Sequence, residues 1–205
     1  MMENYADLMF RGAVAELQRS EGTFEKYQTA YKHRTGSELG PDDVDFIRRR
    51  DSFYLASITE DGWPYVQHRG GARGFVHVVG PNRLACADYR GNRQFITMGN
   101  LQTEARVSLF FIDYMNHARL KLQAKATLKR ASEADPDLVA RVSSAEAPAE
   151  RILVVDVVAI DWNCPKYIPT LYPEDALREI VGPQIARLQA ENEALKSELA
   201  ELRGL

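Results

Sequence analysis

A series of seven short strand-like segments between residues 52 and 162 constrains the fold most strongly. Each segment is apolar or alternates between apolar and polar residues, and turn signals at residues 60–62 and 80–82 separate them. One short helix, expected after residue 94, interrupts the series. Closely spaced strands of this kind favour antiparallel pairing and indicate a barrel or a sandwich. The segments are residues 52–59, 63–71, 75–79, 83–89, 105–114, 119–128 and 151–162.

Helical segments flank the strands on both sides. Residues 3–35 have apolar positions near helical spacing, and because Gly12 and Gly22 interrupt them, we expect two shorter helices there. Another helix is expected from Pro41. Residues 131–150 fit either a helix or an exposed loop. We therefore expect N-terminal helices over residues 1–44, a barrel over residues 45–173 and a C-terminal helix over residues 174–205.

The C-terminal segment carries a leucine-zipper-like heptad pattern. Apolar residues recur seven apart in two series, with Asn192 at one a position of an a/d seam, which favours a parallel two-stranded coiled coil and sets its register. Gly182 and Pro183 are expected to mark the start of this helix. A seam of three heptads is marginal alone, so it either pairs with a second copy, which we favour, or packs on the barrel. The two series are Ile185, Asn192 and Leu199, and Val181, Leu188, Leu195 and Leu202.

Composition excludes several broad classes of protein. The 205 residues are 45% hydrophobic and 27% charged, as in globular proteins. A net charge of −3 gives no general basic field for nucleic acid. No apolar run approaches the roughly 20 residues that span a bilayer, and the N-terminus lacks a signal-peptide core, so we expect a cytoplasmic protein. Cys86, Cys164 and the four histidines are scattered, and no metal site is expected.

Residues 84–101 carry the strongest chemical signal in the chain. They read as a strand, a polar turn and a short helix, and the turn at residues 90–94 holds two arginines, two amides and a glycine. Helix N-termini present free N–H groups and partial positive charge, and arginine forks match phosphate oxygens in pairs. The turn therefore predicts a phosphate site; a solvated surface turn is the alternative.

The segment after the last strand, residues 162–173, is the second candidate. Pro165 and Pro169 exclude regular structure there. Its polar and aromatic side chains are placed either to cover a ligand or to form a packing loop around a core tryptophan. These side chains are Trp162, Asn163, Lys166 and Tyr167.

Four short segments, in this order, resemble the pyridoxamine 5′-phosphate oxidase-like family of FMN-binding split barrels. The likeness covers about residues 45–170 and is strongest for a flavoprotein branch whose substrates are mostly unassigned. It implies a mainly β fold, a split β-barrel of about six to seven antiparallel strands with flanking helices. It also implies a homodimer with one FMN in each of two clefts between subunits. The segments are residues 62–71 (GWPYVQHRGG), 88–94 (DYRGNRQ), 119–122 (RLKL) and 162–165 (WNCP).

The resemblance further implies which residues bind the cofactor. In the family a strand-to-helix turn holds the ribityl phosphate, and a Ser-Arg-Lys-like run of the oxidases corresponds here to residues 92–94, Asn-Arg-Gln. One cation is lost, so Arg93, together with Arg90, carries more of the charge. Residues 67–69 match the strand that runs beside the flavin, and Lys121, with Arg119 nearby, matches a later strand that reaches the phosphate. Trp162, Asn163 and Lys166 lie where the family's C-terminal segment approaches the ring from the other subunit. The full set is Gln67, His68, Arg69, Asp88, Arg90, Asn92, Arg93, Gln94, Arg119, Lys121, Trp162, Asn163 and Lys166.

The function implied by the resemblance is an FMN-dependent oxidoreductase acting on an unidentified small molecule. Pyridoxamine phosphate is not the expected substrate, because a zipper stands where the oxidases carry further basic and aromatic residues. His68 and Tyr167 are candidate proton donors or acceptors, but each also fits a packing role, so no catalytic residue is assigned. The alternatives are a non-catalytic flavin carrier or sensor, a haem-binding relative with His68 or His117 as ligand, a deazaflavin in place of FMN, and a dimeric scaffold without ligand.

Overall fold

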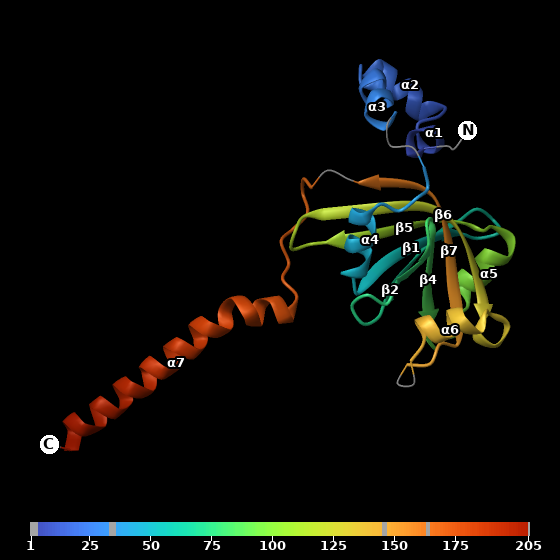
Figure 1. Ribbon diagram of the computed structural model, residues 1–205. Helices are drawn as coiled ribbons and strands as arrows, with labels where there is room; N and C mark the ends of the chain where they lie inside the picture. Colours follow the sequence, from blue (N-terminus) through green and yellow to red (C-terminus); the bar gives the residue numbers. More distant parts are fainter. Residues whose placement is uncertain (1–3, 33–35, 145–146, 163–164, 205) are drawn as a thin grey trace. The chain divides into compact units, whose positions relative to one another are not determined.

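The computed structural model describes residues 4–32, 36–144, 147–162 and 165–204. Its strands form one seven-stranded sheet in the order β2-β1-β5-β6-β7-β4-β3, and every neighbouring pair is antiparallel (Figure 1). The expected mainly β fold with flanking helices, consistent with a split barrel, is confirmed. The strands are β1 (Ser52–Ile58), β2 (Pro64–Gly70), β3 (His77–Gly80), β4 (Arg83–Asp88), β5 (Arg106–Asp113), β6 (Ala118–Arg130) and β7 (Arg151–Trp162).

The helices fall largely where expected, with one correction. The N-terminal region contains three short helices rather than two, because the chain already breaks after Met9 and again at Gly22, whose φ is 67°. Residues 131–150, left open between helix and loop, include one short helix, α6. The helices are α1 (Tyr5–Met9), α2 (Ala13–Ser20), α3 (Phe24–Tyr31), α4 (Pro41–Arg48), α5 (Ile96–Thr103), the 3₁₀ helix η1 (Ala131–Glu133), α6 (Pro136–Val142) and α7 (Glu174–Gly204).

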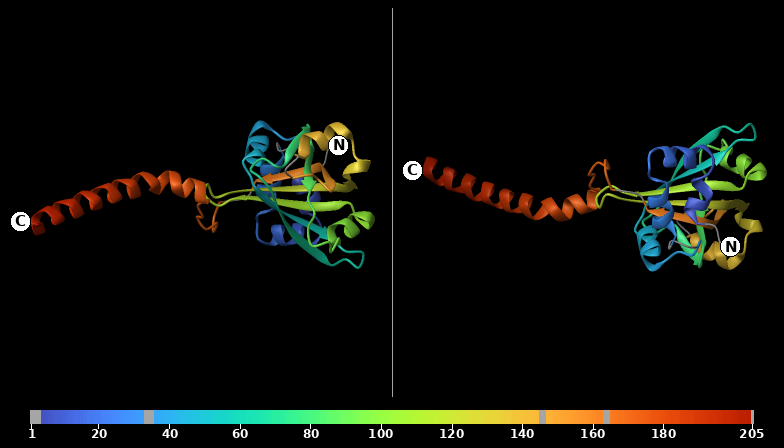
Figure 2. Two further views of the ribbon diagram at one scale, coloured as in Figure 1. Left: turned by 90° about the horizontal axis from the view of Figure 1, so that it is seen from below. Right: turned by 90° about the horizontal axis from the view of Figure 1, so that it is seen from above.

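The larger of two apolar clusters among the described residues lies against one face of the twisted sheet, whose curvature is visible in Figure 2. Since side chains alternate between faces along a strand, β6 buries Leu120 and Leu122 while Lys121 between them points outward. The ring of Phe53 stacks on that of Phe111, with centroids 5.0 Å apart. Helix α4 adds the buried side chain of Ile47 to the same cluster.

The last strand, β7, pairs with β6 on one side and with β4 on the other. β6 and β7 pair over nearly their whole lengths, with one register shift between Gln123 and Ala124. β7 also pairs with β4, so that Asp88, the last residue of β4, lies opposite Arg151, the first residue of β7. This pairing places the start of β7 beside the turn that follows β4.

The chain divides into two compact units, each of which we describe by itself. The first contains residues 1–113 and 118–165 and holds the sheet. The second contains residues 114–117 and 166–205. Within it, His117 Nε2 lies 2.7 Å from Thr170 Oγ1. No helix of the described residues is long and apolar enough to cross a membrane.

Helix α7 accounts for most of the second unit and corrects one expectation. Gly182 and Pro183 do not begin the helix, because α7 runs from Glu174 through Pro183 to Gly204. Figure 1 shows α7 as one helix that bends in its first third. Proline inside a helix removes one backbone hydrogen bond and kinks the axis without always ending it.

Candidate functional site

The connection between β4 and α5 is a turn with unusual backbone geometry. Asn92 Oδ1 accepts a hydrogen bond from the backbone N–H of Gln94 at 3.2 Å, which closes a local side-chain turn. Arg93 and Phe95 have φ values of 61° and 56°, in the left-handed region that residues with side chains rarely adopt. Strain of this kind is typical of turns that bind a ligand.

The start of α5 presents its backbone donors without a side-chain cap. Phe95 occupies the N-cap position in the left-handed conformation and makes no capping hydrogen bond. A left-handed residue followed by a right-handed one, here the helical Ile96, points successive N–H groups toward one concavity that suits an anion. The first N–H groups of a helix also lack intrahelical acceptors and carry partial positive charge. The backbone alone therefore favours an anion at this turn.

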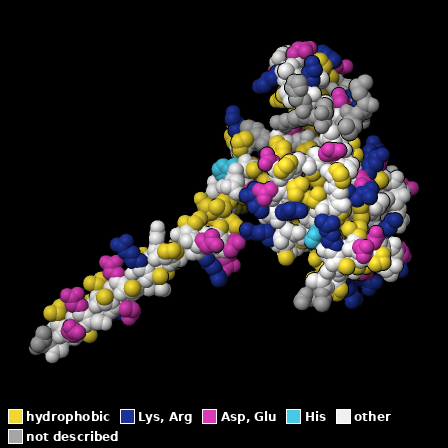
Figure 3. Space-filling view, viewed as in Figure 1, with side chains coloured by type: hydrophobic (Ala, Val, Ile, Leu, Met, Phe, Trp, Pro, Cys, Tyr) yellow, Lys and Arg dark blue, Asp and Glu magenta, His cyan; other side chains and the backbone are white. Residues whose placement is uncertain are grey.

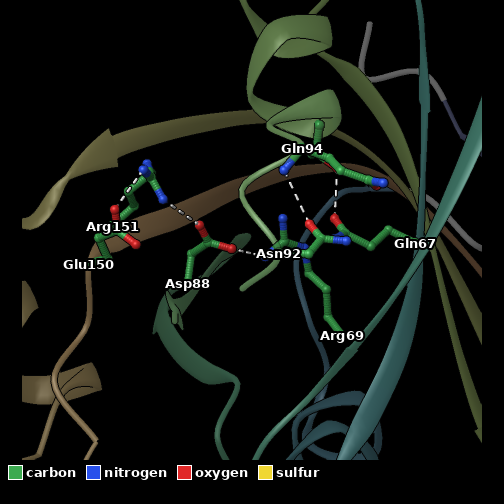
Figure 4. Close-up of polar contacts among 8 residues, drawn as sticks. Gln67, Arg69, Asp88, Asn92, Gln94, Glu150 and Arg151 are labelled. Atoms are coloured by element: carbon green, nitrogen blue, oxygen red, sulfur yellow. Dashed lines mark hydrogen bonds and ion pairs between the residues drawn. The ribbon is translucent and has the colours of Figure 1, made fainter. Parts of the chain in front are cut away.

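Beneath the turn, one carboxylate lies between two guanidinium groups (Figure 4). Asp88 forms an ion pair with Arg69 of β2, and the two side chains are only 17% and 10% exposed. Its other oxygen lies 3.6 Å from Nη1 of Arg151, which also contacts Glu150 at 2.8 Å. The Nε atoms of Arg69 and Arg151 are buried without a hydrogen-bond partner among the described residues. The pairing holds both guanidiniums in place while leaving each with donor capacity.

The exposed ring of Phe95 lies near two guanidinium groups, those of Arg93 and Arg151. Phe95 is 44% exposed, and Cζ of Arg151 and Cζ of Arg93 lie 5.1 Å and 5.9 Å from its ring centroid. Cations over an aromatic face are attracted by its negative quadrupole. Arg93, unlike Arg69 and Arg151, is an exposed side chain. It is therefore the arginine best placed to contact an incoming anion.

Two adjoining hollows lie at the turn, and both belong to the first unit. The narrower has a volume of about 80 Å³ and the wider, more open one about 720 Å³. Arg93, Phe95 and Arg151 line both of them. Pockets for small ligands have volumes of roughly 300–1,000 Å³, so the wider hollow has room for a ring system and the narrower one for a small polar group.

Six of the thirteen expected residues line the narrower hollow. They come from β2, from the end of β4 and from the turn, and Thr97 Oγ1 donates a hydrogen bond to Oε1 of one of them, Gln67, at 2.8 Å. The strand-to-helix turn and the strand at residues 67–69 are therefore brought together, as the resemblance implied. The six residues are Gln67, Arg69, Asp88, Asn92, Arg93 and Gln94.

Two expected residues close to this group do not line the hollows. His68 is exposed on the other face of β2 and meets the ring of Tyr54 edge-on, with centroids 5.5 Å apart. The strand period of two separates it from Gln67 and Arg69. Arg90 is an exposed residue of the turn.

The expected residues of β6 and β7 lie elsewhere in the first unit. Lys121 Nζ is 3.3 Å from Asp161 Oδ2 and 3.2 Å from the hydroxyl of Tyr5 in α1. Arg119, two residues earlier, is on the same outward face of β6 and is half-buried. The indole N–H of Trp162 donates to Asp43 Oδ1 at 2.7 Å. Arg119, Lys121 and Trp162 line neither hollow.

The remaining expectations concern residues 163–167. Asn163 lies outside the described residues. Lys166 belongs to the second unit, as does Tyr167, whose side chain is fully exposed. The roles of Asn163 and Lys166 in cofactor binding, and that of Tyr167 as a proton donor or acceptor, stay predictions.

Three residues that sequence analysis missed contribute to the site. Phe95 and Thr97 follow the turn directly, and the αL conformation of Phe95 has no sequence signal because Gly or Asn is the usual residue there. Arg151 is the first residue of a mostly apolar strand. A charged residue at the end of a core strand is a weak signal by itself, and only the pairing of β7 with β4 brings it to the turn.

Comparison with known proteins identifies the family. The family model of pyridoxamine 5′-phosphate oxidase matches residues 39–164, which is more than half of the chain. The chain belongs to the pyridoxamine 5′-phosphate oxidase family. The resemblance of the four sequence segments is therefore confirmed, and the turn at residues 90–94 and the hollows beside it lie within or next to residues that the family model covers.

Several solved structures are similar to this chain at low sequence identity. HupZ of Group A Streptococcus superposes with a TM-score of 0.50 and 10% identity over 65% of this chain and 99% of its own. An FMN-binding protein of Syntrophomonas wolfei has a TM-score of 0.43 and 11% identity over 75% of this chain and 98% of its own. An F420 reductase has a TM-score of 0.43 and 19% identity over 60% and 98%. A search of curated proteins finds no significant match.

Proposed function

We propose that this member of the pyridoxamine 5′-phosphate oxidase family is an FMN-binding flavoprotein and an FMN-dependent oxidoreductase acting on a small molecule. The observation that carries the proposal is the uncapped, left-handed start of α5, flanked by Arg93 and Arg151 at the edge of two adjoining hollows. A dianionic phosphate needs this combination of cations and free N–H groups.

The residues present fit the cofactor. The buried Nε atoms of Arg69 and Arg151 lack partners among the described residues, and such donors favour a further acceptor at the site. Arg93 and the first N–H groups of α5 hold the phosphate, while Asp88 keeps the two buried guanidiniums oriented and balances part of their charge. Gln67, held by Thr97, offers an amide to the group that occupies the narrower hollow. When bound, FMN supplies hydride or electron transfer.

The proposal includes a homodimer in which the flavin is shared between subunits. His68, Arg119, Lys121 and Trp162 lie outside the hollows of their own chain. They can therefore contribute only in a cleft that a second copy completes, and we retain them as candidates on that basis. Oxidation of pyridoxamine phosphate itself is not proposed, because the C-terminal segment is a long helix with a zipper pattern.

Binding is tested by titrating the apoprotein with FMN and following the quenching of flavin fluorescence. Arg93→Ala should raise the Kd roughly 10- to 100-fold, because a charge-assisted contact contributes about 1.5–3 kcal/mol. Arg83→Ala is the matched control, since Arg83 is also an exposed arginine but lies at the start of β4, pairs with Asp156 at the surface and lines neither hollow. Unchanged affinity in the Arg93 variant would refute the phosphate site.

Turnover is tested separately on the FMN-loaded protein. Reduction by NADH or NADPH, followed by reoxidation with candidate acceptors, is the result expected for an oxidoreductase. Flavin that binds but is never reduced by either nucleotide would favour the carrier or sensor instead. A Soret band in the purified protein, in place of the flavin bands, would favour haem.

A further inference from the structure

The apolar seam of α7 is exposed from Ile185 to Leu202. Five seam residues, Ile185, Leu188, Leu195, Leu199 and Leu202, are 49–64% exposed, and no side chain of α7 between Glu174 and Gly204 is buried. Figure 3 shows hydrophobic side chains along this helix among charged ones. From Val181 to Leu202 the seam extends about 32 Å. An exposed apolar stripe of this length is typical of an interaction surface.

The charges beside the seam differ in sign between its two sides. With Ile185 at position a, the g positions on one side are Glu191 and Glu198. The e positions on the other side are Lys196 and Arg203. Within the single chain, Lys196 forms an exposed ion pair with Glu193 of the same helix, at 2.7 Å. One side of the seam is therefore acidic and the other basic.

This charge pattern selects a partner and an orientation. In a parallel two-stranded coil, each g residue faces the e residue five positions later in the other helix. Glu191 then faces the partner's Lys196, and Glu198 faces the partner's Arg203. In an antiparallel pair, g faces g and e faces e, which would bring Glu against Glu and Lys against Arg. A second copy of the same helix, aligned in parallel, is the complementary surface.

The polar seam residue selects the register. Asn192 occupies the central a position, where it faces its own counterpart only when the two helices are in register. A shift of one heptad would place its amide against Ile185 or Leu199. A buried amide without a hydrogen-bond partner is costly, so the shifted pairs are disfavoured.

The seam has a defined N-terminal limit. The two seam positions that precede Val181 are Arg178, at position a, and Glu174, at position d of the heptad before, and they form an exposed ion pair at 2.6 Å. Pro183 falls at position f, on the side of the helix away from the seam. The bend at this proline therefore leaves the apolar positions from Val181 onward continuous.

We infer that α7 pairs with α7 of a second copy of this chain as a parallel, in-register coiled coil from Val181 to Leu202. Parallel pairing brings the two Glu174 ends together, so both barrels are joined to the same end of the coil. This connection raises the effective concentration of one barrel at the other. The inference goes beyond the proposed function and does not depend on flavin binding.

Cysteine cross-linking of the full-length chain tests the pairing, in a Cys164→Ser background. Leu199→Cys, at position a, should form an intermolecular disulfide on mild oxidation, whereas Ala200→Cys, at the outer position b, should not. Antiparallel pairing centred on the seam would hold the two residues 199 about 20 Å apart. Absence of the Leu199→Cys cross-link would overturn the inference in favour of antiparallel pairing, packing on the barrel, or a different partner protein. Equal cross-linking of both variants would also overturn it.

Charge variants test the orientation with the same readout. Combined with Leu199→Cys, the acidic pair Lys196→Glu and Arg203→Glu should slow cross-linking roughly tenfold, and the basic pair Glu191→Lys and Glu198→Lys should do the same. A mixture of the two variants should restore the wild-type rate and yield mainly the mixed dimer. A rate insensitive to both would overturn the inference. Failure of FMN binding would leave these outcomes unchanged.

Discussion

Asp88, the last residue of β4, lies directly opposite Arg151, the first residue of β7, in the antiparallel register of the two strands. The same carboxylate forms an ion pair with Arg69 of β2. Three strands that are distant in sequence are thus connected by one acidic group below the turn at residues 89–95. Asp88 is therefore the residue on which the geometry of the proposed phosphate site depends.

Replacing Asp88 by asparagine should destabilise the protein by about 1–3 kcal/mol, because the nearly buried guanidinium of Arg69 loses the carboxylate with which it pairs and that of Arg151 loses one of its two, keeping Glu150. Urea denaturation measures the change in the free energy of unfolding. Asp156→Asn is the matched control, since its ion pair with Arg83 is about half exposed and such pairs contribute only about 0–1 kcal/mol. Equal effects of the two substitutions would show that Asp88 has no special structural role.

The left-handed conformation of Phe95 predicts an unusual order of stability among its variants. Phe95→Gly should be more stable than Phe95→Ala by about 1 kcal/mol, because glycine adopts positive φ without strain and is also the better N-cap residue. Thermal or urea unfolding measures the difference. Both variants should bind FMN more weakly than the wild type, since both lose the ring that Arg93 and Arg151 approach. Equal stability of the two variants would contradict the backbone assignment.

His77, at the start of β3, should make the fold sensitive to acid. Burial, with the nearby charges of Arg141 and Arg48, lowers its pKa from the usual value. The unfolded chain therefore binds a proton more readily, and the stability that His77 contributes is present above about pH 6.5 and lost as the pH falls below it. His77→Gln should lose less stability than the wild type between pH 7.5 and 5, as measured by urea midpoints. A parallel loss in both would exclude His77 as the cause.

The buried thiol of Cys86 should be inert in the folded protein. Burial raises its pKa to about 12, so that almost none is thiolate at pH 8. In a Cys164→Ser variant, a thiol reagent such as DTNB should react with no thiol under native conditions and with one in guanidinium. Rapid labelling of the native variant would show that Cys86 is accessible.

Much of the fold could be predicted from local sequence. The seven segments lie within a few residues of the observed strands, because alternation of apolar and polar residues reports directly which face of a strand is buried. The turn at residues 90–94 could be singled out by its own composition. The strand period of two also places Gln67 and His68 on opposite faces of β2, so their separation could have been predicted from the sequence, while the role of His68 stays a prediction.

The sequence by itself determined the strand pattern, the basic turn before α5 and the heptads of α7, since each depends on residues within a short window. Only the tertiary structure decided that Arg151 and Arg69 meet at Asp88, that Lys121 points to Tyr5 and Asp161, and that Phe95 is left-handed. The physical reason is that strand pairing is chosen by burial over the whole sheet. Asp88 and Arg151 are 63 positions apart, and the residues around neither of them indicate that the two will meet.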